Sequence, residues 1–271
     1  MKTKFDLTII VVNFNTAQLT VGCIQSIFDS KPKLSYEVIV VDNASFDNSV
    51  ALLNKHFKNR IKIVKNEANL GFAKANNLAI RQAKAGHILL LNSDTKVTKG
   101  ALDLMLERAL DLSDVGAVVP RLLNSDLTIQ PSIFNFPTIG RAIAQYWLKR
   151  NKDLDKFYPS GDAVVSVEAA VMAAFLITPN CLEKVGLLDE KYFMYFEDLD
   201  YCQRVKKAGL LVWYEPSAKV IHYHGQSGKS MEIEGQEWKR LIPSSKLYHG
   251  LFKHYLFNFV LWIGQKRFFT K

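Results

Sequence analysis

The chain has 271 residues, of which 48% are hydrophobic and 23% are charged, and its formal net charge is +9. These values exclude a disordered chain and fit one large α/β domain or one and a half ordinary domains. The positive charge favours an anionic partner, such as a phosphorylated small molecule, a membrane surface or nucleic acid. Cys23, Cys181 and Cys202 lack the spacing of a zinc site or a disulfide scaffold, so we expect a reducing compartment.

Strands and helices alternate in the first part of the chain. Continuous β-branched runs at 7–12 and 36–41 are typical of buried parallel strands. A helix is expected between them at 16–30, with Thr16 as its N-cap. The next expected elements are a helix at 47–58, a strand at 61–64, a helix at 73–83 and a strand at 87–91. This order predicts a doubly wound, mostly parallel α/β sheet.

The regularity falls after about residue 111. Prolines follow that we interpret as loop markers, at positions 120, 131, 137 and 159. Such loops often carry specificity. The later expected elements are a strand at 164–167, a helix from Pro179, a helix from the acidic residues at 197–200, and strands at 210–214 and 219–221 separated by a loop.

Polar side chains follow each of the first four expected strands. They are Asn13 and Asn15, then Asp42 and Asn43, then 66–69, then Asn92, Ser93 and Asp94. Asn, Asp and Ser are also ordinary turn formers. Four such groups at one carboxyl edge of a parallel sheet nevertheless favour a ligand site.

Asp94 ends an apolar strand, so its carboxylate is expected at this edge. It could hold Mg²⁺ or Mn²⁺ together with phosphate oxygens of a substrate. His222, at the end of the strand at 219–221, could add a nitrogen ligand, which would favour Mn²⁺. A lone histidine is more often a satisfied core or surface residue, and His224 competes for the same role.

Three carboxylates, Glu197, Asp198 and Asp200, directly follow the aromatic run at 192–196. Desolvation by these aromatics and mutual repulsion should raise the pKa of at least one carboxyl group, as a general base requires. The alternative is that the acids only occupy the first turn of a helix that continues through Arg204.

Several motifs, in order, resemble one enzyme family. They are Val-Asn-Phe-Asn at 12–15, Val-Asp-Asn-Ala-Ser at 41–45 with Asp47, Asn-Leu-Gly-Phe-Ala at 69–73 with Asn76, and Leu-Asn-Ser-Asp at 91–94. Residues 5–228 resemble the inverting GT-A glycosyltransferases of family 2. The motifs at 185–189, 193–202 and 220–227 resemble its rhamnosyltransferase-like bacterial branch.

This resemblance implies a GT-A catalytic domain at 1–228, with a nucleotide-sugar-binding half at 1–110 and an acceptor and catalytic half at 111–228. A C-terminal helical segment would follow at 229–271. Asp198 would be the catalytic base, and Glu197 would orient the acceptor or share the proton. The positions implied for the nucleotide-sugar pocket are Asn13, Asn15, Asp42, Asn43, Asn69, Gly71, Asn76 and Ser93.

Asp94 matches the last acid of the family's DxD motif and, with His222, would hold Mn²⁺ or Mg²⁺. Asn92 stands where the first acid of that motif is expected, which leaves fewer charged ligands. Asp42 would contact the nucleotide base or ribose, and Asp200 would orient the helix.

The implied activity is transfer of a sugar from dTDP-rhamnose or a UDP-hexose to a glycan or lipid-linked acceptor, in bacterial surface polysaccharide synthesis. The acceptor hydroxyl would attack the anomeric carbon in line, with inversion. The alternative is a catalytically silent homologue that binds a nucleotide sugar or glycan for a partner enzyme. Nucleic acid is not expected as a partner, because the sequence has no recognition helix, zinc pattern or RNP motif.

The segment 246–271 interleaves aromatic and basic residues. Its apolar stretch at 256–263 is far shorter than the ~20 residues that span a bilayer. We therefore expect an in-plane amphipathic anchor on a cytoplasmic protein that is peripheral at the inner face of the cell membrane. The alternative is a helix packed on the catalytic domain. The resemblance also implies that part of the stretch around Ser245 and 253–254 completes the active site.

Overall fold

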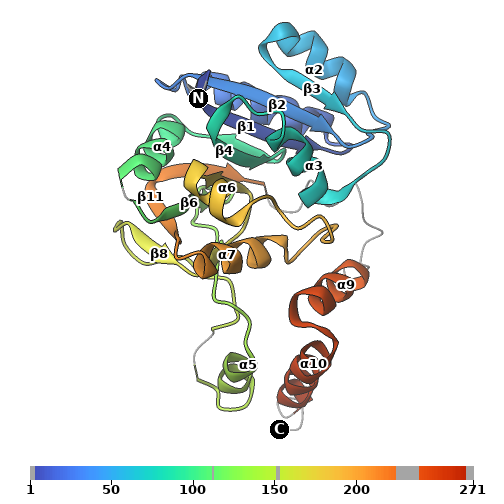
Figure 1. Cartoon of the computed structure of the whole chain (residues 1–271), viewed down its shortest axis with the longest axis vertical. Coiled ribbons are helices and arrows are strands. Elements are labelled where there is room, and N and C mark those ends of the chain that lie inside the picture. The colour runs from blue at the N-terminus through green and yellow to red at the C-terminus, as the bar shows by residue number, and fades with distance from the viewer. Residues whose placement is uncertain (1–3, 112, 151–152, 224–237, 267–271) are drawn as a thin grey trace.

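Helices cover both faces of one central β-sheet (Figure 1). The computed structural model describes residues 4–111, 113–150, 153–223 and 238–266. Nine strands of this part of the chain form the sheet, in the order β3-β2-β1-β4-β10-β6-β11-β5, with β8 paired to β11. The expected doubly wound α/β architecture is confirmed.

The first part of the sheet is parallel throughout, in the order β3-β2-β1-β4. Its elements are β1 (Phe5–Asn13), α1 (Ala17–Asp29), β2 (Tyr36–Asp42), α2 (Ser49–Phe57), the 3₁₀ turn η1 (Lys58–Arg60), β3 (Lys62–Lys65), α3 (Gly71–Ile80) and β4 (Ala85–Asn92). Each strand and helix expected from the sequence is present, with ends that differ by at most three residues.

The second part of the chain adds an antiparallel component. Its elements are β5 (Thr95–Val97), α4 (Ala101–Asp111), β6 (Val115–Leu123), β7 (Ile133–Phe134), α5 (Ile139–Tyr146), β8 (Val165–Val167), β9 (Ala169–Ala170), β10 (Ala174–Ile177), α6 (Pro179–Val185), α7 (Glu197–Lys207) and β11 (Leu211–His222). β10 lies between β4 and β6 and is antiparallel to both. β6 and β11 are parallel to each other, and β7 pairs with β9 apart from the main sheet.

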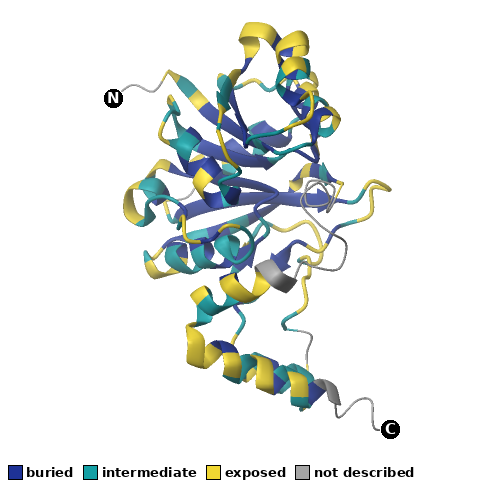
Figure 2. Cartoon of the chain, turned by 90° about the vertical axis from the view of Figure 1, so that its right-hand side faces the viewer, coloured by how far each residue is buried: buried dark blue, intermediate teal, exposed yellow. Residues whose placement is uncertain are grey.

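The two faces of the sheet bury two separate hydrophobic cores, and alternate residues of β1 supply them. Ile9 belongs to the core under α1, α2 and α4, while Ile10 belongs to the core under α3, α6 and α7. This alternation follows from the two-residue period of a strand. Figure 2 shows buried residues concentrated in the strands and exposed residues on the outer helices. The carboxyl edge of β1, β2 and β4 is thereby held rigidly.

Two local expectations were wrong, whereas Thr16 is the N-cap of α1 as expected. Pro120 does not mark a loop, because it lies inside β6, where all nine residues are buried. It lies opposite Glu215, where the pairing of β6 with β11 shifts register, so its missing N–H is tolerated. The loop expected after residue 214 is only this irregularity within a continuous β11. Thr16 occupies the N-cap of α1, but its side chain makes no capping hydrogen bond.

Two C-terminal helices follow, α9 (Trp238–His249) and α10 (Leu251–Lys266); α10 lies beside α5 at one end of the molecule, and α9 packs on α10 (Figure 1). The Trp147 indole N–H donates to the Val260 carbonyl over 2.9 Å. Gly264 lies so close to Tyr146 that a side chain at this position would overlap it. Among the described residues, no helix is long and apolar enough to cross a membrane.

Candidate active site

Asn13 and Asp42 end β1 and β2 as register partners. The Asn13 side chain is fully buried, and its Nδ2 donates to Asp42 Oδ1 over 2.8 Å and to Ser45 Oγ over 3.0 Å. Its Oδ1 accepts from the hydroxyls of Thr16 and Thr20. Asn13 therefore fixes the orientation of the Asp42 carboxylate through its side chain.

The same network reaches the end of β4. The hydroxyls of Thr16 and Ser93 lie 3.1 Å apart, and Ser93 is buried directly before Asp94. A continuous set of polar contacts thus links the predicted nucleotide residue Asp42 to the segment that carries Asp94. The structure brings Asn13, Asp42 and Ser93 together, although they come from three strands.

Asn43 holds the turn that precedes α3. Its Nδ2 donates to Asn69 Oδ1 over 2.8 Å, and its Oδ1 accepts from the Leu70 N–H over 3.0 Å. Asn69 Oδ1 in turn accepts from the Gly71 N–H. Asn43 is buried, so its amide positions this turn rather than facing solvent.

Gly71 connects this turn to the loop that precedes α7. It has φ +77°, and a Cβ at this position would overlap the Phe193 carbonyl oxygen. The next N–H, that of Phe72, donates to the same Phe193 oxygen over 2.8 Å. Glycine is required here for both conformation and space. The predicted donor half and the catalytic loop are therefore in direct contact.

Two other predicted nucleotide residues have different surroundings. Asn15 has φ +53°, and its Oδ1 accepts from the Phe46 N–H over 2.9 Å, which shapes the loop after β2. Asn76 is buried within α3, and its Nδ2 donates to the Phe72 carbonyl of the same helix over 2.9 Å. Asn76 therefore supports α3 through its side chain.

Asp94 and His222 lie side by side, as the sequence predicts for a shared metal site. Asp94 is in the turn between β4 and β5, and His222 is the last residue of β11, paired with Thr95. Both side chains are buried, and His222 Nε2 is 3.4 Å from Asp94 Oδ1. His224, the competing histidine, lies outside the described residues.

These two donors fit a divalent cation. A carboxylate oxygen and an imidazole nitrogen at this separation can bind one ion, and the mixed oxygen and nitrogen set suits Mn²⁺. Within the described ranges, no group of three or more His, Cys, Asp or Glu residues could hold a metal. An ion at Asp94 and His222 would therefore need further ligands, such as the diphosphate oxygens of a substrate.

Glu197 and Asp198 begin α7, behind a left-handed backbone segment. Tyr195 has φ +70° and Phe196 has φ +67°, values that bulky residues rarely adopt. Such strain persists only where surrounding contacts enforce it, and it often marks functional sites. The helix-start interpretation is confirmed, and this helix start also fixes where the two carboxyl groups lie.

Burial changes the acidity of both groups. Desolvation, and then the charge of Asp198, raises the pKa of Glu197 to about 8. Desolvation also raises the pKa of Asp198, although the Leu199 N–H and the Lys156 ammonium oppose the shift. Glu197 Oε2 is buried and has no hydrogen-bond partner among the described residues. Near neutral pH the raised pKa values therefore favour retention of a proton by the pair.

Residues that the sequence did not single out support this loop. Ser244 Oγ of α9 donates to the Met194 carbonyl over 2.8 Å, and the rings of Tyr248 and Phe196 are 5.4 Å apart. Tyr248 had no motif signal, because its role depends on how α9 packs. Ser245 and His254, by contrast, were named from the sequence; Ser245 Oγ lies 2.8 Å from His254 Nδ1, a contact that joins α9 to α10.

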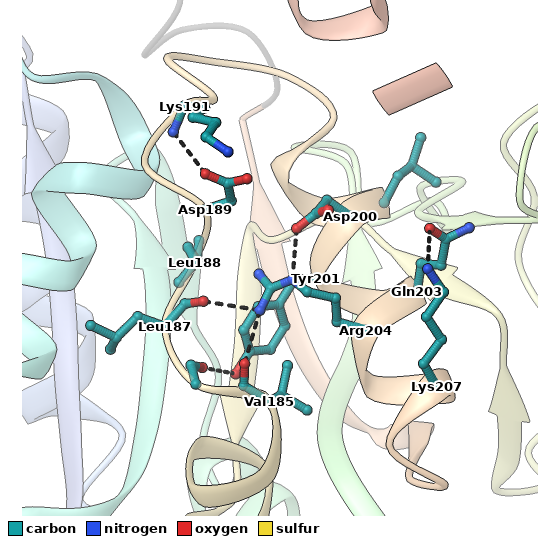
Figure 3. A network of polar contacts seen from close by, with 12 residues as sticks. Val185, Leu187, Leu188, Asp189, Lys191, Asp200, Tyr201, Gln203, Arg204 and Lys207 are labelled. Atoms are coloured by element: carbon teal, nitrogen blue, oxygen red, sulfur yellow. Dashed lines mark hydrogen bonds and ion pairs between the residues drawn. The ribbon is translucent and has the colours of Figure 1, made fainter. Parts of the chain in front are cut away.

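Asp200, the third acid, belongs to a different network (Figure 3). Its Oδ2 accepts from Arg204 Nε over 2.8 Å, one turn along α7. The same guanidinium donates to the carbonyls of Val185 and Leu187. Asp200 and Arg204 therefore fasten α7 to the end of α6 and the segment after it.

Comparisons with known proteins agree with this arrangement. The family model "Glycosyl transferase family 2" matches residues 8–167, more than half of the chain. A Mycobacterium tuberculosis protein named N-acetylglucosaminyl-diphospho-decaprenol L-rhamnosyltransferase is 28% identical over 210 residues, 70% of this chain and 67% of its own length. The dTDP-rhamnosyl transferase RfbF of Shigella flexneri is 23% identical over 230 residues, 83% of this chain and 71% of its own.

The fold also matches a solved structure. The crystal structure of GalNAc-T7 with UDP, GalNAc and Mn²⁺ superposes with a TM-score of 0.62 at 14% sequence identity. The match covers 82% of this chain but only 44% of that chain, so this protein spans less than half of it. The likeness confirms the GT-A fold expected from the sequence. With the match of the family model, the chain belongs to glycosyl transferase family 2.

Proposed function

We propose that this protein is an inverting, metal-dependent glycosyltransferase that moves rhamnose from dTDP-rhamnose to a lipid-linked saccharide in bacterial surface polysaccharide synthesis. The observation that carries the proposal is the pair of desolvated carboxyl groups on Glu197 and Asp198, whose loop contacts the donor half through Phe193 and Gly71. The names of the relatives from Mycobacterium tuberculosis and Shigella flexneri support rhamnose, the dTDP donor and a lipid diphosphate acceptor.

The donor is assigned to the carboxyl edge of the sheet. Asp42, held by Asn13, would contact the base or ribose, and the turn held by Asn43 would line the nucleoside pocket. Asp94 and His222 would hold Mn²⁺ or Mg²⁺, which when bound neutralises charge developing on the leaving diphosphate.

Asp198 is assigned as the base. The raised pKa of Asp198 makes its ionised carboxylate a stronger proton acceptor for the acceptor hydroxyl. The acceptor oxygen then bonds to the anomeric carbon as the bond to the diphosphate oxygen breaks. dTDP leaves on the opposite face, and the configuration inverts. Glycoside hydrolysis would instead need two carboxylates flanking the bond.

A donor panel tests this assignment. Thermal shift with Mn²⁺ present should show the largest stabilisation for dTDP-rhamnose, because a ligand that binds only the folded state raises the melting temperature. Transfer to a polyprenyl diphosphate saccharide should then follow, with an inverted linkage by NMR. A larger rise in melting temperature with a UDP-hexose would identify that sugar nucleotide, and not dTDP-rhamnose, as the donor. Binding without transfer to any acceptor would favour a silent sugar-binding homologue.

We also propose that α10 docks this enzyme on an anionic phospholipid surface. One side of the helix exposes Leu251, Phe252, Tyr255, Phe259 and Trp262, with more than half of each side chain accessible. No acidic residue occurs between positions 243 and 271, and Lys253 is exposed beside the aromatic face. Aromatic residues combined with lysines suit the headgroup region. All three cysteines are unpaired, which supports a position at the inner face of the membrane.

Vesicle co-sedimentation tests the docking surface. The full chain should bind phosphatidylglycerol vesicles, and binding should weaken in phosphatidylcholine vesicles or high salt. The double variant Phe252→Ser with Trp262→Ser should lose binding, whereas Leu110→Ser, at an exposed position on α4, should retain it. If the protein instead forms concentration-dependent dimers and does not bind vesicles, the exposed face of α10 would be a dimer interface rather than a membrane-binding surface.

A further inference from the structure

The hairpin after β6 places a glutamine against the predicted metal ligand His222. Gln130 is buried, and its Oε1 lies 2.8 Å from His222 Nδ1. The other ring nitrogen, Nε2, lies on the side of Asp94 Oδ1, 3.4 Å away. Which ring nitrogen carries the proton decides whether Nε2 can offer a lone pair to a cation.

The partners of Gln130 determine the direction of its amide. Gln130 Nε2 donates to Asn124 Oδ1 over 2.9 Å and to the backbone carbonyl of His222 over 3.2 Å. Since a carbonyl oxygen can only accept, the amide nitrogen must face these two groups. The Gln130 oxygen is then left facing His222 Nδ1, which must carry the proton in order to donate.

The orientation of Asn124 is fixed in the same way. Its Nδ2 donates to Thr128 Oγ1 over 2.9 Å, and the Thr128 hydroxyl donates to Asp126 Oδ1 over 2.6 Å. Hydrogen bonds from Thr128 lower the pKa of Asp126, so this carboxylate is ionised at neutral pH and only accepts. The chain of donors therefore runs in one direction, toward Asp126.

We propose that Gln130, oriented by Asn124, is a positioning residue that keeps His222 in the Nδ1–H tautomer and so presents Nε2 as a ligand beside Asp94. The proposal rests on the metal site of the proposed function. Such partners of ligating histidines set the tautomer and ring orientation, and their loss typically weakens metal binding about 10–100-fold. Neither Gln130 nor Asn124 touches the cation in this scheme.

The tautomer can be measured without metal or activity. In ¹⁵N-labelled full-length protein containing EDTA at pH 8, the ring nitrogens of His222 should report a protonated Nδ1 and a bare Nε2. The chain has six histidines, so loss of the signal in His222→Gln assigns it. A protonated Nε2 in the wild-type protein would overturn the proposal.

Variants test the dependence on Gln130. Gln130→Met should lose the tautomer preference, and its Kd for Mn²⁺ in calorimetry should rise about 10–100-fold. Gln130→Glu retains an acceptor for Nδ1–H, so it should keep the tautomer and bind Mn²⁺ nearly as well as wild type. Gln25→Met is the matched control, because Gln25 bonds only its exposed helix neighbour Asp29 over 2.8 Å among the described contacts.

Misfolding of a variant and failure of the proposed function can both be distinguished from failure of the tautomer proposal. If circular dichroism shows that Gln130→Met does not fold, Asn124→Ala tests the proposal instead. This variant should shift the tautomer ratio of His222, and it should weaken Mn²⁺ binding less than the roughly 10–100-fold expected for Gln130→Met. A folded Gln130→Met with wild-type tautomer and Kd would overturn the proposal. Failure of sugar transfer with the tautomer and Mn²⁺ affinity intact would instead overturn only the proposed function.

Discussion

Asn13 at the sheet edge and Glu197 at the start of α7 differ in how their polar atoms are satisfied. Asn13 uses both ends of its amide, and its Nδ2 holds the Asp42 carboxylate. Glu197 has a buried oxygen without a hydrogen-bond partner among the described residues, and the backbone before it is strained. Satisfied networks make a rigid pocket, whereas unsatisfied carboxyl groups keep an altered proton affinity. Rigid recognition and proton transfer are thus built by different means in one fold.

Among substitutions that test the difference between the sheet edge and the start of α7, the largest effect is expected at Asp198. Asp198→Asn preserves size but cannot accept the proton, so kcat for transfer should fall about 10²–10⁴-fold. The melting temperature should stay the same or rise, because a buried carboxyl group with a raised pKa is replaced by a neutral amide. Steady-state transfer assays and thermal melts check both parts. Transfer at the wild-type rate would show that another group is the base.

A pH-dependent effect is expected at Glu197. Unfolded Glu197 ionises near 4.5, whereas the folded group holds its proton up to about 8. The folded state therefore binds more protons in this range, and stability should fall as the pH rises from about 4.5 to about 8. In the wild-type protein the unfolding free energy should fall by a few kcal/mol, since one pKa unit corresponds to about 1.4 kcal/mol. Glu197→Gln has no proton to lose at this position, so its unfolding free energy should not show this fall.

Urea unfolding at pH 5.5 and pH 8.5 measures this difference. Glu183→Gln, an exposed glutamate on α6, is the control and should leave the wild-type pH dependence in place. If wild type and Glu197→Gln lost stability in parallel across this range, the buried proton would not belong to Glu197.

A smaller effect tests the contact that joins the two parts. Gly71→Ala and Gly100→Ala both place a side chain at positive φ, which costs about 1 kcal/mol. At Gly71 the new Cβ also meets Phe193, whereas nothing lies within 4 Å of it at Gly100. Gly71→Ala should therefore cost about 1–3 kcal/mol more in unfolding free energy and should reduce transfer. Equal losses of unfolding free energy in the two variants would show that the contact between Gly71 and Phe193 adds no constraint at this position.

The smallest effect is expected within the satisfied network. Thr16→Val removes a buried hydroxyl that donates to Asn13 Oδ1, and should cost about 1 kcal/mol of unfolding free energy. Thr98→Val, which removes a less buried hydroxyl bonded to the Lys219 carbonyl over 2.7 Å, should cost less. Urea unfolding compares the two. A larger loss at Thr98 would mean that the network around Asn13 adds little rigidity.

Local sequence patterns predicted the parallel half of the fold well. The runs at 7–12 and 36–41 are continuous and β-branched, so period and residue type agree there. Pro120 misled the prediction, because a proline is tolerated inside a strand only where the partner strand shifts register. That shift depends on residues about 95 positions later. Similarly, the short apolar segment 174–177 that becomes β10 gives no signal of its antiparallel placement.

The site shows the same division. Asp94 and His222 were predicted to lie together and do so, because Asp94 follows the end of β4 and His222 ends β11. Gln130 was missed, since its hydrogen bond to His222 spans 92 positions and no local pattern marks it. Tyr248 and Ser244 were missed because their contacts with the catalytic loop depend on the packing of α9.

The position of β10 has a consequence for synthesis of the chain. The stretch recognised as family 2 ends at residue 167, yet β10, at Ala174–Ile177, fills the middle of the sheet between β4 and β6. Until the ribosome has released β10, the apolar edge of β4 has no neighbour on that side, and open edges promote aggregation. A fragment cut at residue 167 would keep most of the recognisable motifs but would lack the strand that joins the two halves.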